Sequence, residues 1–132
     1  MDATKDTDTL DVIVIGWGKG GKTLAGTLAR AGRRVAIVEQ SEKMYGGTCI
    51  NIGCVPTKTL IHDAETRGEK NFDPGYFDSA VTRRDKLTAM MRTKNFSMLD
   101  ELDSVLVLTG AASFTGPHSV RVETAEQRLE LS

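Results

Sequence analysis

Two short apolar runs, separated by a segment with helical spacing, dominate the first third of the chain. Residues 11–15 (DVIVI) and 35–39 (VAIVE) are nearly continuous in apolar, mostly β-branched side chains, as is typical of strands buried on both faces of a parallel sheet. Between them, apolar residues recur every three to four positions and Gly32 follows the last of them, which predicts a helix that ends there. The order strand, tight turn, helix, strand is one βαβ unit.

The rest of the chain alternates helical and extended patterns. We expect a glycine-punctuated loop at 41–53, a helix that opens at Pro56, polar irregular structure at 68–76 and a largely helical segment at 77–102. If that last helix is interrupted, we expect the interruption at Asn95 to Ser97. A third strand at 104–110 and a hairpin of 118–124 with 127–132 follow. The apolar stripe of the long helix would comprise Ala80, Leu87, Met90, Met91, Met98, Leu99 and Leu102. The pattern predicts an α/β fold.

Composition narrows the class of protein. A hydrophobic content of 39% and a charged content of 27% are ordinary for a globular domain, and a net charge of −1 provides no basic field for nucleic acid. Residues 1–9 are polar and acidic, so we expect a disordered leader rather than a signal peptide. The apolar runs are too short to span a membrane. We therefore expect a cytoplasmic protein without nucleic-acid or membrane partners.

The turn after the first strand, GWGKGGKT (16–23), matches two phosphate-binding signatures at once. Gly16, Gly18 and Gly21 form the dinucleotide fingerprint, whereas Gly16, Gly21, Lys22 and Thr23 fit the phosphate loop of nucleotide hydrolases. Only the dinucleotide motif requires Gly18, and Glu39 ends the next strand where a carboxylate accepts hydrogen bonds from a ribose. The third strand lacks the terminal Asp that a hydrolase needs for Mg²⁺. The sequence favours the dinucleotide motif over the hydrolase, and over a glycine turn without a ligand.

Both cysteines of the chain, Cys49 and Cys54, lie in GGTCINIGCVPTK (46–58). A disulfide between them would close too short a loop to stabilise the fold much, so reactivity is the better explanation. Cys54 directly precedes a predicted helix, whose dipole favours a thiolate, and Lys58 follows one turn later. A pair of ordinary buried cysteines is the alternative. A zinc site is disfavoured because it needs about four ligands and His62 and His118 are unsuitably placed, so we predict no metal site.

The cysteine segment, with the βαβ unit before it, resembles the pyridine nucleotide-disulfide oxidoreductases such as glutathione reductase, dihydrolipoamide dehydrogenase and mercuric reductase. The resemblance extends through ASF (112–114) to the final hairpin. It implies a Rossmann-like FAD-binding domain in which Cys54 contacts the flavin, with a charge-transfer complex, and Cys49 attacks the substrate. It further assigns the pyrophosphate to Gly16, Gly18 and Gly21, the ribose to Glu39, the flavin side to Gly47, Thr48 and Lys58, and the adenine end to the Ala112 backbone.

Details such as GKGGKTLAGTLA and RTKNF are most similar to the bacterial reactive-chlorine-resistance branch of the family. The resemblance implies a homodimeric reductase that passes electrons from NAD(P)H through FAD and the cysteine pair to a metal ion, a disulfide or an oxidant. Because family members are much longer, we interpret residues 10–132 as a partial FAD-binding domain without the nicotinamide and dimerisation domains. We expect this fragment to be inactive alone, with apolar surface of strands 11–15 and 35–39 facing water. The alternatives are a non-enzymatic nucleotide-binding module and, less favoured, the phosphate-loop hydrolase.

Overall fold

A computed structural model describes residues 9–67 and 73–132 of the chain. Most of the predicted leader, and 68–72 of the predicted irregular segment, lie outside the described residues. Thr9, which was assigned to the leader, is described, and its hydroxyl accepts a hydrogen bond of 2.8 Å from Arg34 Nη1.

The central layer is a parallel sheet, as the sequence predicts, and its three strands lie in the order β1-β2-β3. Its strands are β1 (Val12–Ile15), β2 (Val35–Glu39) and β3 (Val105–Thr109). Helix α1 (Lys19–Arg30) connects β1 to β2 and completes the βαβ unit. Strand β2 is central, so Val35 lies opposite Val12 on one side and Val105 on the other.

Strand β2 is buried on both faces because a different layer covers each one. Val35 and Ile37 belong to the core shared with α1 and the end of the long helix α4 (Gly75–Asp100), whereas Ala36 and Val38 pack against the second sheet. Full burial of such an aliphatic side chain contributes about 1.5–3 kcal/mol. The expectation that β2 exposes apolar surface is therefore wrong, although Ile15 at the end of β1 is 48% exposed.

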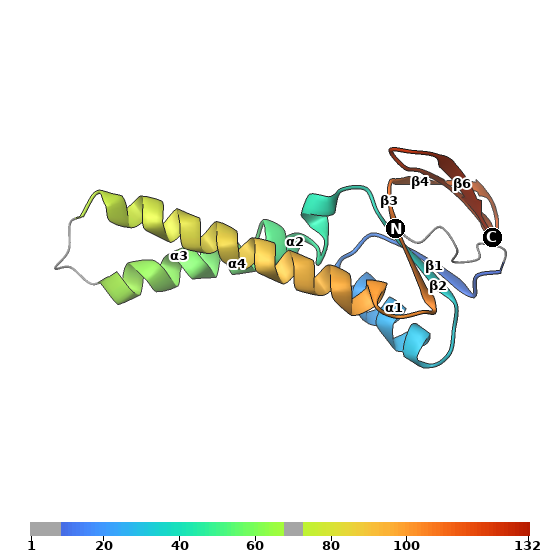
Figure 1. Cartoon of the computed structure of the whole chain (residues 1–132), viewed down its shortest axis with the longest axis horizontal. Coiled ribbons are helices and arrows are strands. Elements are labelled where there is room, and N and C mark those ends of the chain that lie inside the picture. The colour runs from blue at the N-terminus through green and yellow to red at the C-terminus, as the bar shows by residue number, and fades with distance from the viewer. Residues whose placement is uncertain (1–8, 68–72) are drawn as a thin grey trace.

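The second sheet is antiparallel and lies over the parallel one (Figure 1). It consists of β4 (Ala111–Gly116), β5 (Ser119–Glu123) and β6 (Arg128–Leu131). The predicted hairpin corresponds to β5 and β6, and its alternating residues Val120, Val122 and Leu131 are buried. Strand β4 was not predicted as a strand, because AASFTG shows no apolar alternation.

The cysteine segment and the long helix depart from their predicted structure. The expected loop at 41–53 contains a short 3₁₀ helix at Glu42–Met44 and helix α2 (Thr48–Asn51), and α3 (Cys54–Arg67) begins at Cys54 instead of at Pro56. Helix α4 has no interruption at Asn95 to Ser97. The Asn95 amide donates 2.8 Å to the Met91 carbonyl and so bonds within the helix.

Helices α3 and α4 form a hairpin that projects away from the sheets (Figure 1). At its far end Tyr76 Oη donates 2.7 Å to the Asp63 carbonyl, and Arg83 pairs with the Asp63 carboxylate. The predicted stripe of α4 is only partly right, because Met90 and Met98 are 60% and 51% exposed. Helix α4 contacts α3, α2, α1 and β3. Its first part lies beside α3 and its last part near α1 (Figure 1), so its buried face changes along its length.

Candidate functional site

The turn between β1 and α1 needs glycine at two positions for the fold itself. Gly16 has a φ of +97°, and its N–H donates 2.8 Å to the Val38 carbonyl of the neighbouring strand. A Cβ at Gly21 would lie 2.5 Å from the Gly16 carbonyl oxygen and 3.1 Å from Val14 Cγ1. Both glycines therefore allow α1 to start close against the end of β1.

Gly18 and Gly20 in the same turn have no such role. Gly18 has a φ of −61°, which any residue adopts, and a Cβ at either position would meet no protein atom within 4 Å. Gly18 is the N-cap of α1, no side chain caps the helix, and its first turn has no acidic residue. A helix N-terminus without a side-chain cap or an acidic residue is the arrangement that binds phosphate.

Glu39 ends β2 beside this turn and is half-buried. Its Oε2 accepts a hydrogen bond of 3.0 Å from the backbone N–H of Trp17. Its Oε1 accepts one of 3.3 Å from the backbone N–H of Ser41. The Gly110 N–H donates 2.9 Å to the Glu39 carbonyl, so β4, which carries the predicted site residue Ala112, begins next to Glu39. A carboxylate has about four acceptor positions, so two backbone bonds leave capacity for ribose hydroxyls.

The geometry does not support the phosphate-loop alternative. Lys22 Nζ donates 2.5 Å to Asn95 Oδ1 on α4, and the Thr23 hydroxyl donates 2.7 Å to the Lys19 carbonyl one turn back. A hydrolase needs both side chains at the phosphates and at Mg²⁺. Here they serve helix packing, as the dinucleotide motif allows.

The cysteine segment packs directly on the glycine turn. Gly47 has a φ of +81°, and a Cβ there would lie 2.8 Å from Gly18 Cα and 3.1 Å from the Trp17 carbonyl oxygen. The Trp17 and Tyr45 ring centroids lie 4.9 Å apart in the same contact. Burial raises the pKa of Tyr45, whose hydroxyl forms a hydrogen bond with Thr109 Oγ1. The two predicted motifs thus form one surface.

Cys49 is the second residue of α2, Cys54 is the first residue of α3, and both are exposed free thiols. The thiols contact each other, and the hydrogen bond with Cys54 raises the pKa of Cys49. The charge of Lys19, in the first turn of α1, acts in the opposite direction. The disulfide itself stays a prediction, because the structure contains the dithiol.

The remaining predicted residues are near the cysteines and accessible. Thr48 is the exposed first residue of α2, and Lys58 is exposed one turn after Cys54 on α3. Within residues 9–67 and 73–132, no group of three or more His, Cys, Asp and Glu side chains is placed to hold a metal ion. Among the described helices, none combines the length and apolarity needed to cross a membrane.

Three polar residues interact with the cysteine segment, and none of them was predicted to have a role. Asn51 donates to the carbonyls of Tyr45 and Gly47, at 2.9 Å each, and accepts 2.9 Å from Arg92 Nε of α4. The charge of Lys19 lowers the pKa of Cys49. Asn51 and Lys19 lie inside the two motifs, which was the available signal, whereas nothing in the sequence connects Arg92 with residues 41 positions earlier.

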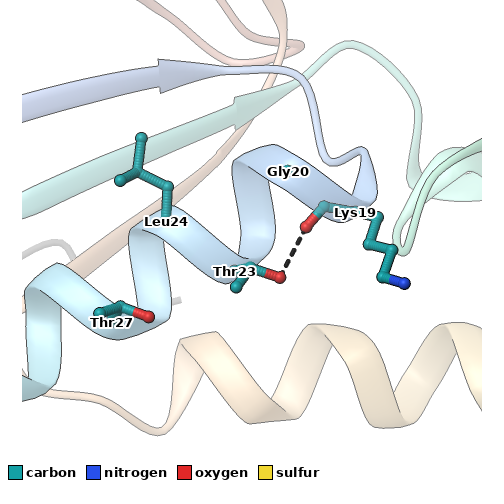
Figure 2. Close-up of a pocket in the computed structure, with 5 residues that line it drawn as sticks. All are labelled: Lys19, Gly20, Thr23, Leu24 and Thr27. Atoms are coloured by element: carbon teal, nitrogen blue, oxygen red, sulfur yellow. Dashed lines mark hydrogen bonds between the residues drawn. The ribbon is translucent and has the colours of Figure 1, made fainter.

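A surface hollow lies along α1, beside the glycine turn (Figure 2). It is lined by Lys19, Gly20, Thr23, Leu24 and Thr27. None of the predicted site residues lines it, although Lys19 follows Gly18 directly and its charge acts on Cys49.

Comparison with known proteins identifies relatives over nearly the whole chain. The family model described as pyridine nucleotide-disulphide oxidoreductase matches residues 10–130. The probable pyridine nucleotide-disulfide oxidoreductase RclA of Escherichia coli K12 is 49% identical over 119 residues, which are 90% of this chain and 25% of RclA. The dihydrolipoyl dehydrogenase of Zymomonas mobilis is 32% identical over 128 residues, with 90% of this chain and 27% of that protein covered.

Solved structures agree with these relatives. The Cu(II) complex of the HOCl-induced flavoprotein disulfide reductase RclA from E. coli matches with a TM-score of 0.83 and 47% identity, over 94% of this chain and 26% of that chain. The Rossmann-like fold and the resemblance to the reactive-chlorine-resistance branch are thereby confirmed. The chain spans about a quarter of the length of the curated relatives it matches.

Proposed function

Because the chain belongs to the pyridine nucleotide-disulphide oxidoreductase family, we propose that it is the FAD-binding and dithiol-bearing part of a flavoprotein reductase. In this proposal electrons pass from NAD(P)H through FAD and the Cys49–Cys54 pair to an acceptor. The relatives are oxidoreductases of the same family, which supports the general class of reaction. The path through named residues is the part that we propose.

One observation carries the proposal, namely the contact between Gly47 and Gly18. The Cα positions are so close that a Cβ on Gly47 would lie 2.8 Å from Gly18 Cα. A group bound against the open N-terminus of α1 therefore also lies beside the segment that carries the cysteines. A dinucleotide site and a dithiol that served unrelated purposes would need no such contact.

The residues fit FAD on the chain's own geometry. Gly18 and Gly21 would present backbone N–H groups to the pyrophosphate, as helix N-termini do, while Gly16 would let the turn approach it closely. Glu39 would accept from the adenosine ribose, and the Ala112 backbone would face the adenine end. Gly47, Thr48 and Lys58 would line the flavin side. When bound, FAD supplies a two-electron carrier between the nicotinamide and the dithiol.

The cysteines have distinct roles in the proposal. Cys54, at the start of α3, would lie next to the flavin. Cys49 attacks the acceptor. With a disulfide acceptor, the Cys49 thiolate forms a mixed disulfide and releases one acceptor thiol; Cys54 then displaces the second and closes the Cys49–Cys54 disulfide.

The acceptor is a metal ion, a disulfide or an oxidant. A solved relative is a Cu(II) complex, so Cu(II) is the first metal ion to test. We also propose a homodimer for the whole reductase, and a cytoplasmic location, where reducing conditions keep a reactive dithiol available. No metal ion is a resident cofactor in this proposal.

A chimera tests the proposal, with residues 10–130 in place of the matched quarter of E. coli RclA. We expect a yellow protein that oxidises NADH or NADPH when an acceptor is present. Cys49→Ser and Cys54→Ser should each reduce the steady-state rate to background, whereas His118→Gln, at an exposed turn, should leave it unchanged. Full activity in both serine variants would contradict the dithiol mechanism. Bound FAD without turnover would favour the non-enzymatic nucleotide-binding module.

A further inference from the structure

The side-chain amide of Asn51 closes the turn that carries Cys49. Its Nδ2 donates to the carbonyls of Tyr45 and Gly47, both at 2.9 Å. The two N–H groups of the amide are thus both used, which fixes the orientation of the side chain. Asn51 lies between the two cysteines in sequence, so this orientation bears on how Cys49 faces Cys54.

The oxygen of the same amide is held from a distant helix. Arg92 Nε, in α4, donates 2.9 Å to Asn51 Oδ1, and both side chains are half-buried. A charge-assisted hydrogen bond of this kind is stronger than a neutral one. Removing Arg92 would leave an amide oxygen partly shielded from water without its protein partner.

Helix α4 also contacts the glycine side of the site. Asn95, almost one turn after Arg92, accepts from Lys22 Nζ of α1. A Cβ on Gly46 would lie 3.2 Å from Asn95 Cγ, so the Asn95 side chain packs against the start of the cysteine segment. Helix α4 therefore braces both the helix that follows the glycine turn and the turn before Cys49.

We infer that Arg92 is a positioning residue for the Cys49–Cys54 pair and acts through the amide of Asn51. The inference rests on the proposed function, because it concerns the redox step of that dithiol. Arg92 acts through its N–H at the Nε position, which orients the amide. The charge that lowers the pKa of Cys49 comes from Lys19 instead.

Disulfide formation is sensitive to this kind of positioning. The reaction is dithiol plus glutathione disulfide giving the Cys49–Cys54 disulfide plus two glutathione thiols, so two electrons and two protons leave the chain. A disulfide needs a narrow range of Cβ separations and torsion angles. When Arg92 and Asn51 hold the turn in one conformation, less conformational entropy is lost on forming the disulfide than when the turn samples many conformations.

The test measures the dithiol–disulfide equilibrium of the 132-residue chain in glutathione buffers, with trapping of free thiols and mass spectrometry. Arg92→Met removes the donor, and Arg92→Gln retains an N–H at the same distance along the side chain; both remove the charge. We expect Arg92→Met to disfavour the disulfide by about three- to tenfold, the effect of one ordinary hydrogen bond. In Arg92→Gln, the dithiol–disulfide equilibrium should return most of the way to the wild-type value. Arg84→Met is the matched control, because Arg84 pairs with the adjacent Asp85.

An equilibrium for Arg92→Met that equals the wild type would overturn the inference, and so would equal losses for Met and Gln. Circular dichroism checks the fold of each variant. If Arg92→Met does not fold, Arg92→Lys replaces it, because lysine keeps the charge and carries a methylene where Nε lies; an unchanged equilibrium in Arg92→Lys would also overturn the inference. A wild-type chain that forms no Cys49–Cys54 disulfide in any buffer would contradict the proposed function, and the inference with it.

Discussion

The glycine turn at 16–23 and the cysteine segment at 46–58 are both rich in glycine, yet they use it differently. In the cysteine segment, Gly46 and Gly47 both have positive φ and both lack room for a Cβ. In the glycine turn these two properties are divided, because Gly16 has a positive φ with room for a Cβ, whereas Gly21 lacks room for a Cβ. Gly18 and Gly20 have ordinary backbone angles or open surroundings, so their absent side chains leave space for something outside the chain.

This difference separates stability from binding at neighbouring positions. Gly47 and Gly18 contact each other, yet a methyl group added to Gly47 would press into the protein, whereas one added to Gly18 would project into open space. Variants at the two positions should therefore affect different measurements.

Gly47→Ala should have the largest effect on stability. The change combines a positive φ with a Cβ 2.8 Å from Gly18 Cα, so we expect unfolding to become easier by about 3 kcal/mol or more. Gly32→Ala is the matched control, because Gly32 has a φ of +83° with no atom near its Cβ position, and it should cost about 1 kcal/mol. Urea unfolding of the chain measures both. Equal losses of unfolding free energy in Gly47→Ala and Gly32→Ala would contradict the crowding at Gly47.

Gly18→Ala should weaken FAD binding without weakening the fold. A methyl group between the N-terminus of α1 and the pyrophosphate removes about one charge-assisted hydrogen bond, or roughly 1.5–3 kcal/mol of binding free energy. The free energy of unfolding should change by less than about 0.5 kcal/mol, because the lost capping preference offsets the lower entropy of the unfolded chain. FAD titration of the apo-chimera and urea unfolding of the chain test this pair of outcomes. A loss in stability alone would assign Gly18 to the fold.

Glu39→Ala should weaken FAD binding by roughly 1–3 kcal/mol, since it removes the carboxylate proposed to accept from the ribose. Glu39 also accepts from Trp17 N–H, so some loss of stability should accompany the change. Titration with FMN, which lacks the adenosine, provides the control: the FMN affinity should be unaffected. Equal effects on FAD and FMN would place Glu39 outside the ribose site.

The smallest effect concerns the pH dependence of Cys49. The hydrogen bond with Cys54 is the main cause that raises the pKa of Cys49, so Cys54→Ala should lower that pKa. The midpoint of the rate of Cys49 alkylation by iodoacetamide should then move to lower pH, because the thiolate is the reactive form. Lys19→Met should move the midpoint to higher pH, since Lys19 lowers this pKa. Shifts in the same direction would contradict these interactions.

The sequence predicted the elements whose side chains follow one simple period. Strand β2 is apolar from Val35 to Val38 because each face is covered, and the hairpin residues Val120 and Val122 alternate over a single core. Strand β4 has no such pattern, since AASFTG is mostly exposed. The stripe of α4 failed at Met90 and Met98, because the helix changes the partner that it contacts along its length.

Of the site, the sequence predicted the residue types that motifs require. It could not predict contacts that depend on the register between distant elements. The approach of Gly47 to Gly18 and the hydrogen bond from Arg92 to Asn51 both join segments that only the folded chain brings together. The contact between the thiols was predicted only as a disulfide, whereas the structure contains the dithiol.

The central claim is that the glycine turn and the cysteine segment form one site, so that a bound flavin exchanges electrons directly with the dithiol. Anaerobic titration of the oxidised chimera with one equivalent of NADPH or dithionite tests it, with thiol counting and absorbance recorded together. The account predicts two new thiols, a long-wavelength absorbance band, and the loss of that band in Cys54→Ser. Bleaching of the flavin at one equivalent without new thiols would contradict it.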